Sequence, residues 1–239
     1  NANEKKTALS RFKCYSKALY RIFDGQGWDW VITPRNKEQS FAMDLLLDEH
    51  VPIVTLIGKA GSGKTLAAIS AGLQQVLEGR TYKRLIVSRP VQPMGRDIGY
   101  LPGTMEEKMR PWLAPIRDNM QFLMGNDKIM MEEYMTNGTV EIEALTYIRG
   151  RSISNAYIIV DEAQNLSRHE LKTIITRVGE DTKIVLTGDI EQIDNVYIDE
   201  TSNGLTYAVE KFKHAEIAGH ITLQKGERSK VATLAARIL

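Results

Sequence analysis

The sequence predicts an α/β domain in which a parallel β-sheet carries helices on both faces. Three observations lead to this prediction. Short β-branched runs recur from Pro52 onward, helical patterns separate them, and a glycine-rich turn joins the first run to the first helical pattern. The chain has 239 residues, which suits one large domain or one domain with an appendage.

Six apolar runs are expected to form the strands of this sheet. They are PIVTLIG (52–58), RLIVSRP (84–90), VEIEAL (140–145), AYIIVDE (156–162), KIVLTGD (183–189) and HITLQ (220–224). A helix is expected over LAAISAGLQQVLEG (66–79), directly after the first run. Residues 91–137 are long and rich in Pro and Met, and we expect them to form a helical insertion between the second and third strands.

Residues 1–33 differ from the rest and are expected to form an N-terminal lead-in segment or linker ahead of a domain at 34–239. Their pattern predicts a basic helix from about Leu9 to Phe23, then a Gly-containing turn and a Trp-rich extended piece. The chain starts at Asn1 instead of methionine, so we interpret it as a processed or recombinant fragment.

Composition excludes several classes of protein. Hydrophobic residues make up 43% and charged residues 26%, and no apolar run approaches the roughly 20 residues of a membrane helix. The single cysteine, Cys14, and a polar N-terminus without a secretion signal favour a reducing compartment, so a cytoplasmic location is expected. The net charge of +1 gives no general attraction to polyanions, so any nucleic-acid site must be local. The scattered histidines show no zinc spacing.

The segment GKAGSGKT (58–65) satisfies G-x-x-x-x-G-K-[ST] and lies between a strand and a helix. Glycines let such a loop turn its backbone N–H groups toward an anion, and the helix N-terminus adds partial positive charge. Lys64 is expected to reach the β- and γ-phosphates of a nucleotide, and the Thr65 hydroxyl to complete the shell of a magnesium ion. The loop residues expected to bind the nucleotide are Gly58, Ala60, Gly61, Ser62, Gly63, Lys64, Thr65 and Leu66.

Two acids follow the apolar run IIV (158–160) directly. Asp161 ends a strand that is expected to lie near the phosphate loop, where a carboxylate holds the magnesium shell. Glu162 points elsewhere and is expected to polarise the water that attacks the γ-phosphate. An acid in this position favours hydrolysis over transfer to a small substrate.

A third strand ends in LTGDIEQ (186–192). Asp189 and Gln192 are expected to contact the γ-phosphate or its attacking water and to report hydrolysis to other parts of the molecule. Gly-Asp alone is a frequent turn, so this interpretation depends on the two preceding motifs.

In this order, the three motifs make the chain resemble the RecA-like core of superfamily 1 helicases and, more closely, the PhoH-like ATPase family. The resemblance covers most of residues 34–239. It includes the segment 34–65, SRP after the second strand, YIRGRS before the acidic strand, and GERS near the C-terminus. It implies that Gln164 belongs to a helicase-like Asp-Glu-Ala-Gln box and joins the nucleotide site.

The resemblance also implies roles for two residues outside the phosphate loop. Gln39 is expected to read adenine, because its amide matches the donor and acceptor on the adenine edge. Arg228 is expected to sense the γ-phosphate or to reach into a neighbouring subunit's site. By chemistry alone, a Gln that opens an amphipathic helix is more often solvated, and for Arg228 local capping or pairing at the surface is the alternative.

Nucleic-acid contacts are expected from four arginines. Arg89 follows the second strand where helicase cores meet a single strand, and Arg96 lies among the basic and aromatic residues of the insertion. Arg149 and Arg151 are similar in position to arginines of the family, and either a finger acting in trans or a nucleic-acid contact fits them.

The expected function is therefore ATP hydrolysis with Mg²⁺, coupled to single-stranded nucleic acid, RNA more than DNA, by translocation or unwinding. A single core lacks the second lobe of a monomeric helicase, so a ring is expected, and the family suggests a hexamer. One branch of the family carries an N-terminal PIN nuclease domain, and a fragment of that branch is one interpretation. A nucleotide-switched scaffold and a small-molecule phosphotransferase remain alternatives.

Overall fold

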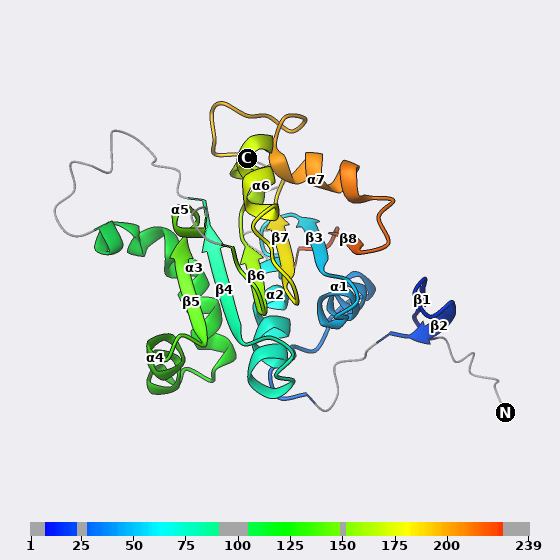
Figure 1. The fold of residues 1–239 in the computed structure, drawn as a ribbon, viewed down its shortest axis with the longest axis horizontal. Coiled ribbons are helices and arrows are strands. Elements are labelled where there is room, and N and C mark those ends of the chain that lie inside the picture. The colour runs from blue at the N-terminus through cyan, green and yellow to red at the C-terminus, as the bar shows by residue number, and fades with distance from the viewer. Residues whose placement is uncertain (1–7, 23–27, 91–104, 149–151, 227–239) are drawn as a thin grey trace.

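A parallel sheet of six strands forms the centre of the computed structural model, which describes residues 8–22, 28–90, 105–148 and 152–226 (Figure 1). The strands are β3 (Ile53–Gly58), β4 (Arg84–Arg89), β5 (Val140–Ala144), β6 (Ala156–Val160), β7 (Lys183–Gly188) and β8 (Ala218–Leu223). Their order is β5-β4-β6-β7-β3-β8, and every neighbouring pair is parallel. All six predicted strands are confirmed, and β7 lies between the strands that lead to the phosphate loop and to Asp161.

Helices cover both faces of this sheet, as predicted. One face packs against α1 (Lys37–Leu47), α2 (Lys64–Leu73), α3 (Met105–Leu123) and α4 (Lys128–Thr136). The other face packs against α5 (Leu145–Ile148), α6 (Arg168–Ile175) and α7 (Gly204–Phe212). A π-helical turn, Gln74–Glu78, extends α2 and completes the predicted helix over 66–79.

The strands are apolar throughout because both of their faces are buried. In β6, Tyr157 and Ile159 join the core beneath α1 to α4, whereas Ile158 and Val160 join the core beneath α6 and α7. The period of two residues along a strand produces this division. Asp161 follows at the point where the apolar run stops.

The described part of the insertion is helical, as predicted. Helix α3 packs Met109, Leu113, Ile116 and Met120 into the core, a spacing that places them on one helical face. Asp127 caps the start of helix α4, and its side chain accepts a hydrogen bond from the Met130 N–H.

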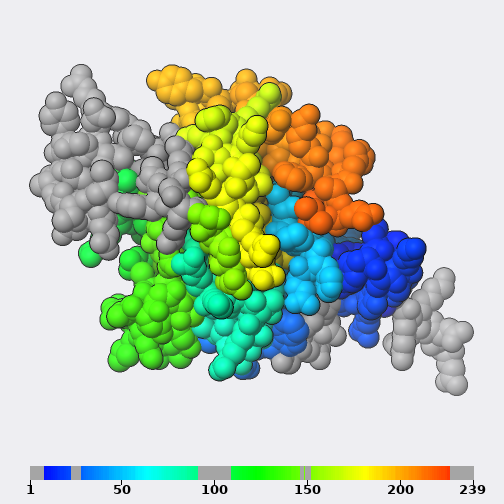
Figure 2. Space-filling model, viewed as in Figure 1, coloured from blue at the N-terminus to red at the C-terminus, as the bar shows by residue number. Residues whose placement is uncertain are grey.

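The predicted basic helix over residues 9–23 is wrong. The chain forms a hairpin of β1 (Ser10–Lys13) and β2 (Ala18–Arg21), which protrudes at one side of the molecule in dark blue (Figure 2). Arg11 and Lys13 alternate along β1 and reach the same side, where Arg11 pairs with Asp44 and Asp48 of the α1 region. The ammonium of Lys13 lies 3.0 Å from the Asp48 carboxylate. These long-range ion pairs favour a strand, because alternate residues of a strand point to the same side. The local sequence pattern of the segment does not reveal them.

The Trp-rich piece is irregular and runs beside α2. The Trp30 N–H donates to the Gln74 side chain at 3.1 Å, and the Ile32 N–H donates to the Ser70 hydroxyl at 3.0 Å. These backbone groups are therefore satisfied by side chains of α2 and of the π-helical turn that extends it, without joining a strand. The same path brings residues 32–35 toward the first turn of α2.

Helix α1 is held at both ends. At its start the Asn36 side chain accepts from the Gln39 N–H at 2.9 Å. At its end the Lys183 ammonium, fully buried on β7, donates to the carbonyls of Leu45, Asp48 and Val51 at 2.7 to 2.9 Å. These bonds satisfy carbonyl oxygens that a helix end leaves without partners. Burial lowers the pKa of Lys183 to about 7.

Among the residues that the structure describes, no helix is both long enough and apolar enough to cross a membrane.

Candidate nucleotide-binding site

The loop Gly58 to Thr65 connects β3 to α2 and has the backbone conformation that its glycines allow. Gly61 and Gly63 have φ values of +79° and +86°, in the left-handed region that side chains disfavour. Gly58 is required by space, because a Cβ there would lie 2.5 Å from the Leu223 carbonyl oxygen of β8. The loop therefore ends at the N-terminus of α2, where an anion is stabilised.

Two side chains inside this loop fit a polyphosphate. The Lys64 ammonium is buried and donates to the carbonyls of Gly58 and Lys59 at 2.5 and 3.1 Å. The Ser62 hydroxyl is fully buried and has no hydrogen-bond partner among the described residues. A cation and an unpaired buried hydroxyl within a ring of backbone groups are suited to phosphate oxygens.

Asp161 lies directly against the start of α2. Its Oδ1 accepts hydrogen bonds from the Thr65 hydroxyl at 2.7 Å and from the Thr187 hydroxyl of β7 at 2.6 Å. The side chain of Asp161 is buried. Its backbone N–H donates to the Ser88 carbonyl at 2.8 Å and so continues the hydrogen bonding between β6 and β4. Mg²⁺ beside a bound phosphate is coordinated by oxygen ligands such as a hydroxyl and a carboxylate. Thr65 and Asp161 therefore fit this ion.

Glu162 turns away from Asp161 because its backbone is left-handed, with φ at +54°. Its Oε2 accepts from the Gln164 amide at 2.5 Å, and its Oε1 lies 3.6 Å from the Arg89 guanidinium. Burial and the neighbouring charge of Asp161 raise the pKa of Glu162, while Gln164, Arg89 and Lys64 oppose the rise. A half-buried carboxylate with a raised pKa has the properties of a general base.

Gln164 joins the acidic strand to the predicted sensor segment. Its side chain is fully buried; the Oε1 accepts from the Asp189 N–H at 3.1 Å, and the Nε2 donates to the Gln192 carbonyl at 2.8 Å. Gly188 leaves the space for this contact, because a Cβ there would lie 2.4 Å from the Gln164 oxygen. A single amide thus connects the Glu162 carboxylate to the backbone of residues 189–192.

Asp189 touches the phosphate loop itself. Its Oδ2 accepts from the Ala60 N–H at 2.8 Å, and its Oδ1 accepts from the Glu191 N–H at 3.1 Å. The side chain of Gln192 is exposed. The geometry therefore brings Asp189 to the loop through a backbone hydrogen bond, and brings Gln192 to Gln164 through its main chain.

A pocket of about 570 Å³ opens beside the loop, next to Gln39. The Gln39 Oε1 accepts from the Arg35 N–H at 2.8 Å, and its Nε2 donates to the Ser62 carbonyl at 3.1 Å. Both bonds fix the amide plane while leaving one lone pair and one N–H for a ligand. The lining residues are Ile32, Thr33, Pro34, Arg35, Gln39, Gly61, Gly63, Leu66 and Phe122.

Two residues of this region were missed in the sequence. Thr187 precedes Gly188 in LTGD. The available signal was its position two residues before Asp189, at the end of a predicted strand. Phe122 lies off the buried stripe of α3 and is 63% exposed, so an apolar residue outside the helical period was its signal. It brings the insertion to the nucleotide pocket.

Four predicted arginines, namely Arg96, Arg149, Arg151 and Arg228, lie outside the described residues. Arg89 is described, and it lies at the carboxyl end of β4 beside Glu162. The sheet therefore gathers Lys64, Thr65, Asp161, Glu162 and Asp189 at one edge, where the carboxyl ends of its strands meet.

A strand, phosphate loop and helix, followed by a strand-end aspartate that meets the loop's threonine, define a P-loop NTPase. The sequence profile described as "PhoH-like protein" matches residues 31–238. The chain belongs to the PhoH-like protein family, whose members are P-loop ATPases.

Curated relatives agree with this assignment. Protein PhoH2 of Bacillus subtilis (strain 168) is 56% identical over 212 residues, which cover 88% of this chain and 48% of the relative. Protein PhoH2 of Mycolicibacterium smegmatis is 43% identical over 206 residues, which cover 86% of this chain and 46% of the relative. The chain thus spans about half the length of these relatives.

Among solved structures, the Pif1 helicase from Candida albicans is similar with 14% sequence identity and a TM-score of 0.44, over 86% of this chain and 43% of that chain. The helicase MrfA bound to DNA is similar with 13% identity and a TM-score of 0.48, over 92% of this chain and 29% of that chain.

Proposed function

We propose that this chain hydrolyses ATP with Mg²⁺ and couples each turnover to a single-stranded nucleic acid, RNA more than DNA. The observation that carries the proposal is the contact between Thr65 and Asp161 beside the turned-out carboxylate of Glu162. This arrangement separates a site for holding a metal ion from a site for activating water.

Phosphate binding falls to the loop and to Lys64. The ammonium lies among carbonyl oxygens of its own loop and is a short side-chain movement from any anion in that ring. Thr65 and Asp161 would hold Mg²⁺, which supplies charge neutralisation to the β- and γ-phosphates when bound. Thr187 keeps the Asp161 carboxylate oriented through its hydroxyl.

Water activation falls to Glu162. A raised pKa brings a carboxylate closer to the pH at which it accepts and releases a proton readily. Arg89 and Gln164 hold its two oxygens from different sides, so the carboxylate has a fixed direction. This supports transfer of the γ-phosphoryl group to water over transfer to a bound acceptor.

Adenine selection falls to Gln39 and Phe122. The anchored amide offers one acceptor and one donor, which match N6 and N7 of adenine; guanine has acceptors at both of the matching positions. Phe122 supplies an aromatic face from the insertion. ATP is therefore the nucleotide that this pocket suits.

Coupling follows from Gln164. It connects the Glu162 carboxylate to residues 189–192. These residues begin the loop that joins β7 to α7, at the upper edge of Figure 1. Val196 and Tyr197 in this loop are 86% and 91% exposed. An exposed aromatic and Arg89 near the hydrolysis site support a single-strand contact here, because bases stack on aromatics and phosphates pair with arginine.

The ring remains part of the proposal. A single core has no second lobe to close over the γ-phosphate, so an arginine supplied by a neighbouring copy, with Arg149, Arg151 and Arg228 as candidates, would complete the site. A hexamer is the assembly that we propose. A PIN nuclease domain ahead of this core is consistent with the greater length of the relatives.

The test is steady-state ATPase with and without single-stranded RNA or DNA, for wild type, Lys64→Ala and Glu162→Gln. We expect RNA to stimulate the wild type, Lys64→Ala to lose nucleotide binding, and Glu162→Gln to bind ATP but hydrolyse it about 100-fold more slowly. Full hydrolysis by Glu162→Gln would disprove the assignment of the base.

Two further readouts separate the alternatives. An unchanged rate with both polymers would favour a nucleotide-switched scaffold over a motor, and phosphate transfer to an added acceptor would favour a phosphotransferase. Molar mass measured with and without ATP would test the ring independently of catalysis.

A further inference from the structure

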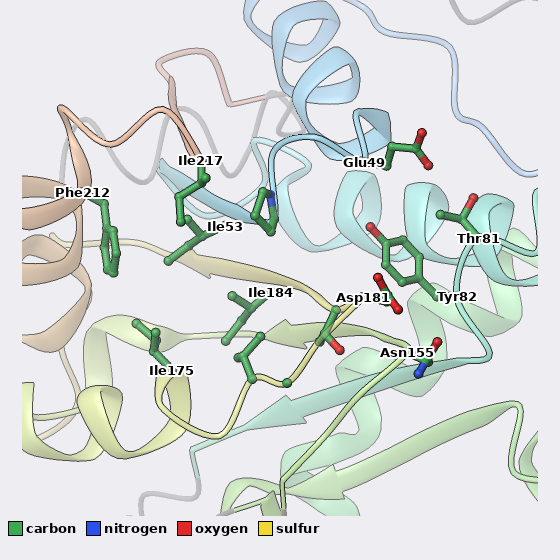
Figure 3. A pocket seen from close by; sticks show the side chains of 14 residues that line it. Glu49, Ile53, Thr81, Tyr82, Asn155, Ile175, Asp181, Ile184, Phe212 and Ile217 are labelled. Carbon is green, nitrogen blue, oxygen red and sulfur yellow. The ribbon is translucent and has the colours of Figure 1, made fainter. Parts of the chain in front are cut away.

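Figure 3 shows a second pocket, of about 720 Å³. It lies at the edge of the sheet opposite the nucleotide site. It is built where strands begin: Ile53 opens β3, Asn155 precedes β6, and Asp181 precedes β7. The phosphate loop, Asp161 and Asp189 follow the other ends of the same strands. The pocket is therefore separate from the ATP site, and its volume is within the range of small-molecule sites.

One wall of this pocket is aliphatic and aromatic. It is formed by Ile53, Ile175, Ile184, Phe212 and Ile217, which gather on one side in Figure 3. Ile217 is 54% exposed and Phe212 is half-buried, so apolar surface is open to water here. Covering this wall with the apolar body of a ligand is favourable.

The other wall is polar, and its charged residues are both acidic. Glu49 and Asp181 lie on the side of the pocket that faces away from the isoleucines, with the ring of Tyr82 near both (Figure 3). Their negative charges, after burial itself, raise the pKa of Tyr82 to about 12. The tyrosine hydroxyl is thus protonated throughout the physiological range.

Tyr82 is the least expected member of this wall. Only 6% of the residue is exposed, and its ring packs edge-on against Tyr157 with ring centroids 5.6 Å apart. Its hydroxyl has no hydrogen-bond partner within the described part of the chain, although the group lines the pocket. The ring is buried but the hydroxyl oxygen keeps contact with solvent, so a ligand atom in the pocket can take up its unused hydrogen bond.

We propose that this pocket binds a small organic cation, namely a primary ammonium or guanidinium group carried on an aliphatic chain. The cationic head donates to the Glu49 and Asp181 carboxylates and to the Tyr82 oxygen, all of which accept hydrogen bonds. The chain lies on the isoleucine wall. An anionic ligand of the same shape meets two carboxylates and is repelled.

The test uses three probes of equal chain length: n-hexylamine at pH 7, 1-hexanol and hexanoate. Four isoleucines line the pocket, so methyl NMR of isoleucine-labelled protein reports occupancy directly. We expect hexylamine to shift the methyls of Ile53, Ile175, Ile184 and Ile217 at about tenfold lower concentration than hexanol. Hexanoate should shift none of them, and saturation with ATP should leave the hexylamine response unchanged.

Variants identify the head-group contacts. Glu49→Gln combined with Asp181→Asn should lower hexylamine affinity about tenfold, to the level of hexanol, and Tyr82→Phe should lower it about threefold. Glu180→Gln, which removes an exposed carboxylate beside the pocket that does not line it, should have no effect. Equal binding of hexylamine and hexanol to wild type, or unchanged affinity in the double variant, would overturn the proposal.

Discussion

Thr65 and Asp161 are joined by a hydrogen bond of 2.7 Å, although the chain separates them by 96 residues. In the sheet, β7 lies between β3, which leads to Thr65, and β6, which leads to Asp161. Helix α2 packs against β7, and Thr187 of that strand donates to the same carboxylate oxygen. Strand β7 thus contacts Asp161 through Thr187. Asp189, which follows β7, contacts the phosphate loop at the Ala60 N–H.

Replacing Asp161 by Asn should abolish most Mg²⁺-dependent hydrolysis, with a loss of about 100-fold or more, because the oxygen next to Thr65 loses its charge. Nucleotide binding measured in EDTA should change little. A magnesium titration of ATPase rate checks this, with Thr173→Ala as control, since that hydroxyl bonds only within its own helix. Normal magnesium dependence in Asp161→Asn would contradict the assignment.

Replacing Gln164 by Ala should lower kcat roughly tenfold to 100-fold and leave KM nearly unchanged. The substitution removes the hydrogen-bond partner of Glu162, of the Asp189 N–H and of the Gln192 carbonyl. It removes no hydrogen bond from the phosphate loop or from the pocket beside Gln39. Steady-state kinetics separate the two parameters. A rise in KM alone would show that Gln164 acts in nucleotide binding instead.

Replacing Phe122 by Ala should weaken binding of ATP and ADP about tenfold, because the base loses an aromatic surface. Binding of tripolyphosphate, which has no base, should be unchanged, and Phe122→Trp should restore nucleotide affinity. Ile129→Ala on α4 is the matched control, since it removes another exposed apolar side chain of the insertion. Equal losses for ATP and tripolyphosphate would exclude a stacking role.

Replacing Lys183 by Met should destabilise the fold by about 3 kcal/mol, since three carbonyl oxygens lose their donor. The pKa of this lysine falls from 10.5 to about 7 on folding. Between these pH values the unfolded chain binds more protons than the folded chain, so the free energy of unfolding of wild type should rise with pH.

Urea unfolding of both proteins at pH 7, 8 and 9 measures this difference. The gap between wild type and Lys183→Met should widen as the pH rises, whereas the exposed Lys172→Met should follow wild type at every pH. A constant gap would show that Lys183 keeps its proton in the folded state.

The sequence allowed the strands and the phosphate site to be predicted because their signals are local. Buried parallel strands are apolar along their whole length, and the residues that follow them, such as Asp161 and Asp189, must meet at one edge of the sheet. A glycine-rich turn between such a strand and a helix leaves few other interpretations for Gly61 and Lys64.

The hairpin and pocket-lining residues such as Phe122 and Tyr82 could not be predicted in the same way. Arg11 and Lys13 form strand contacts because Asp44 and Asp48 lie opposite them, and that pairing spans more than 30 residues. Phe122 and Tyr82 have meaning only once distant segments pack beside them. Tertiary context outweighs local propensity in these cases.

Helix α1 has 11 residues, which makes it about 16 Å long, and its two ends serve different surroundings. Gln39 in the first turn bonds to the phosphate loop, while Asp44 and Asp48 near the last turn hold the N-terminal hairpin. The position of the hairpin and the position of the Gln39 amide are therefore set by the same short helix.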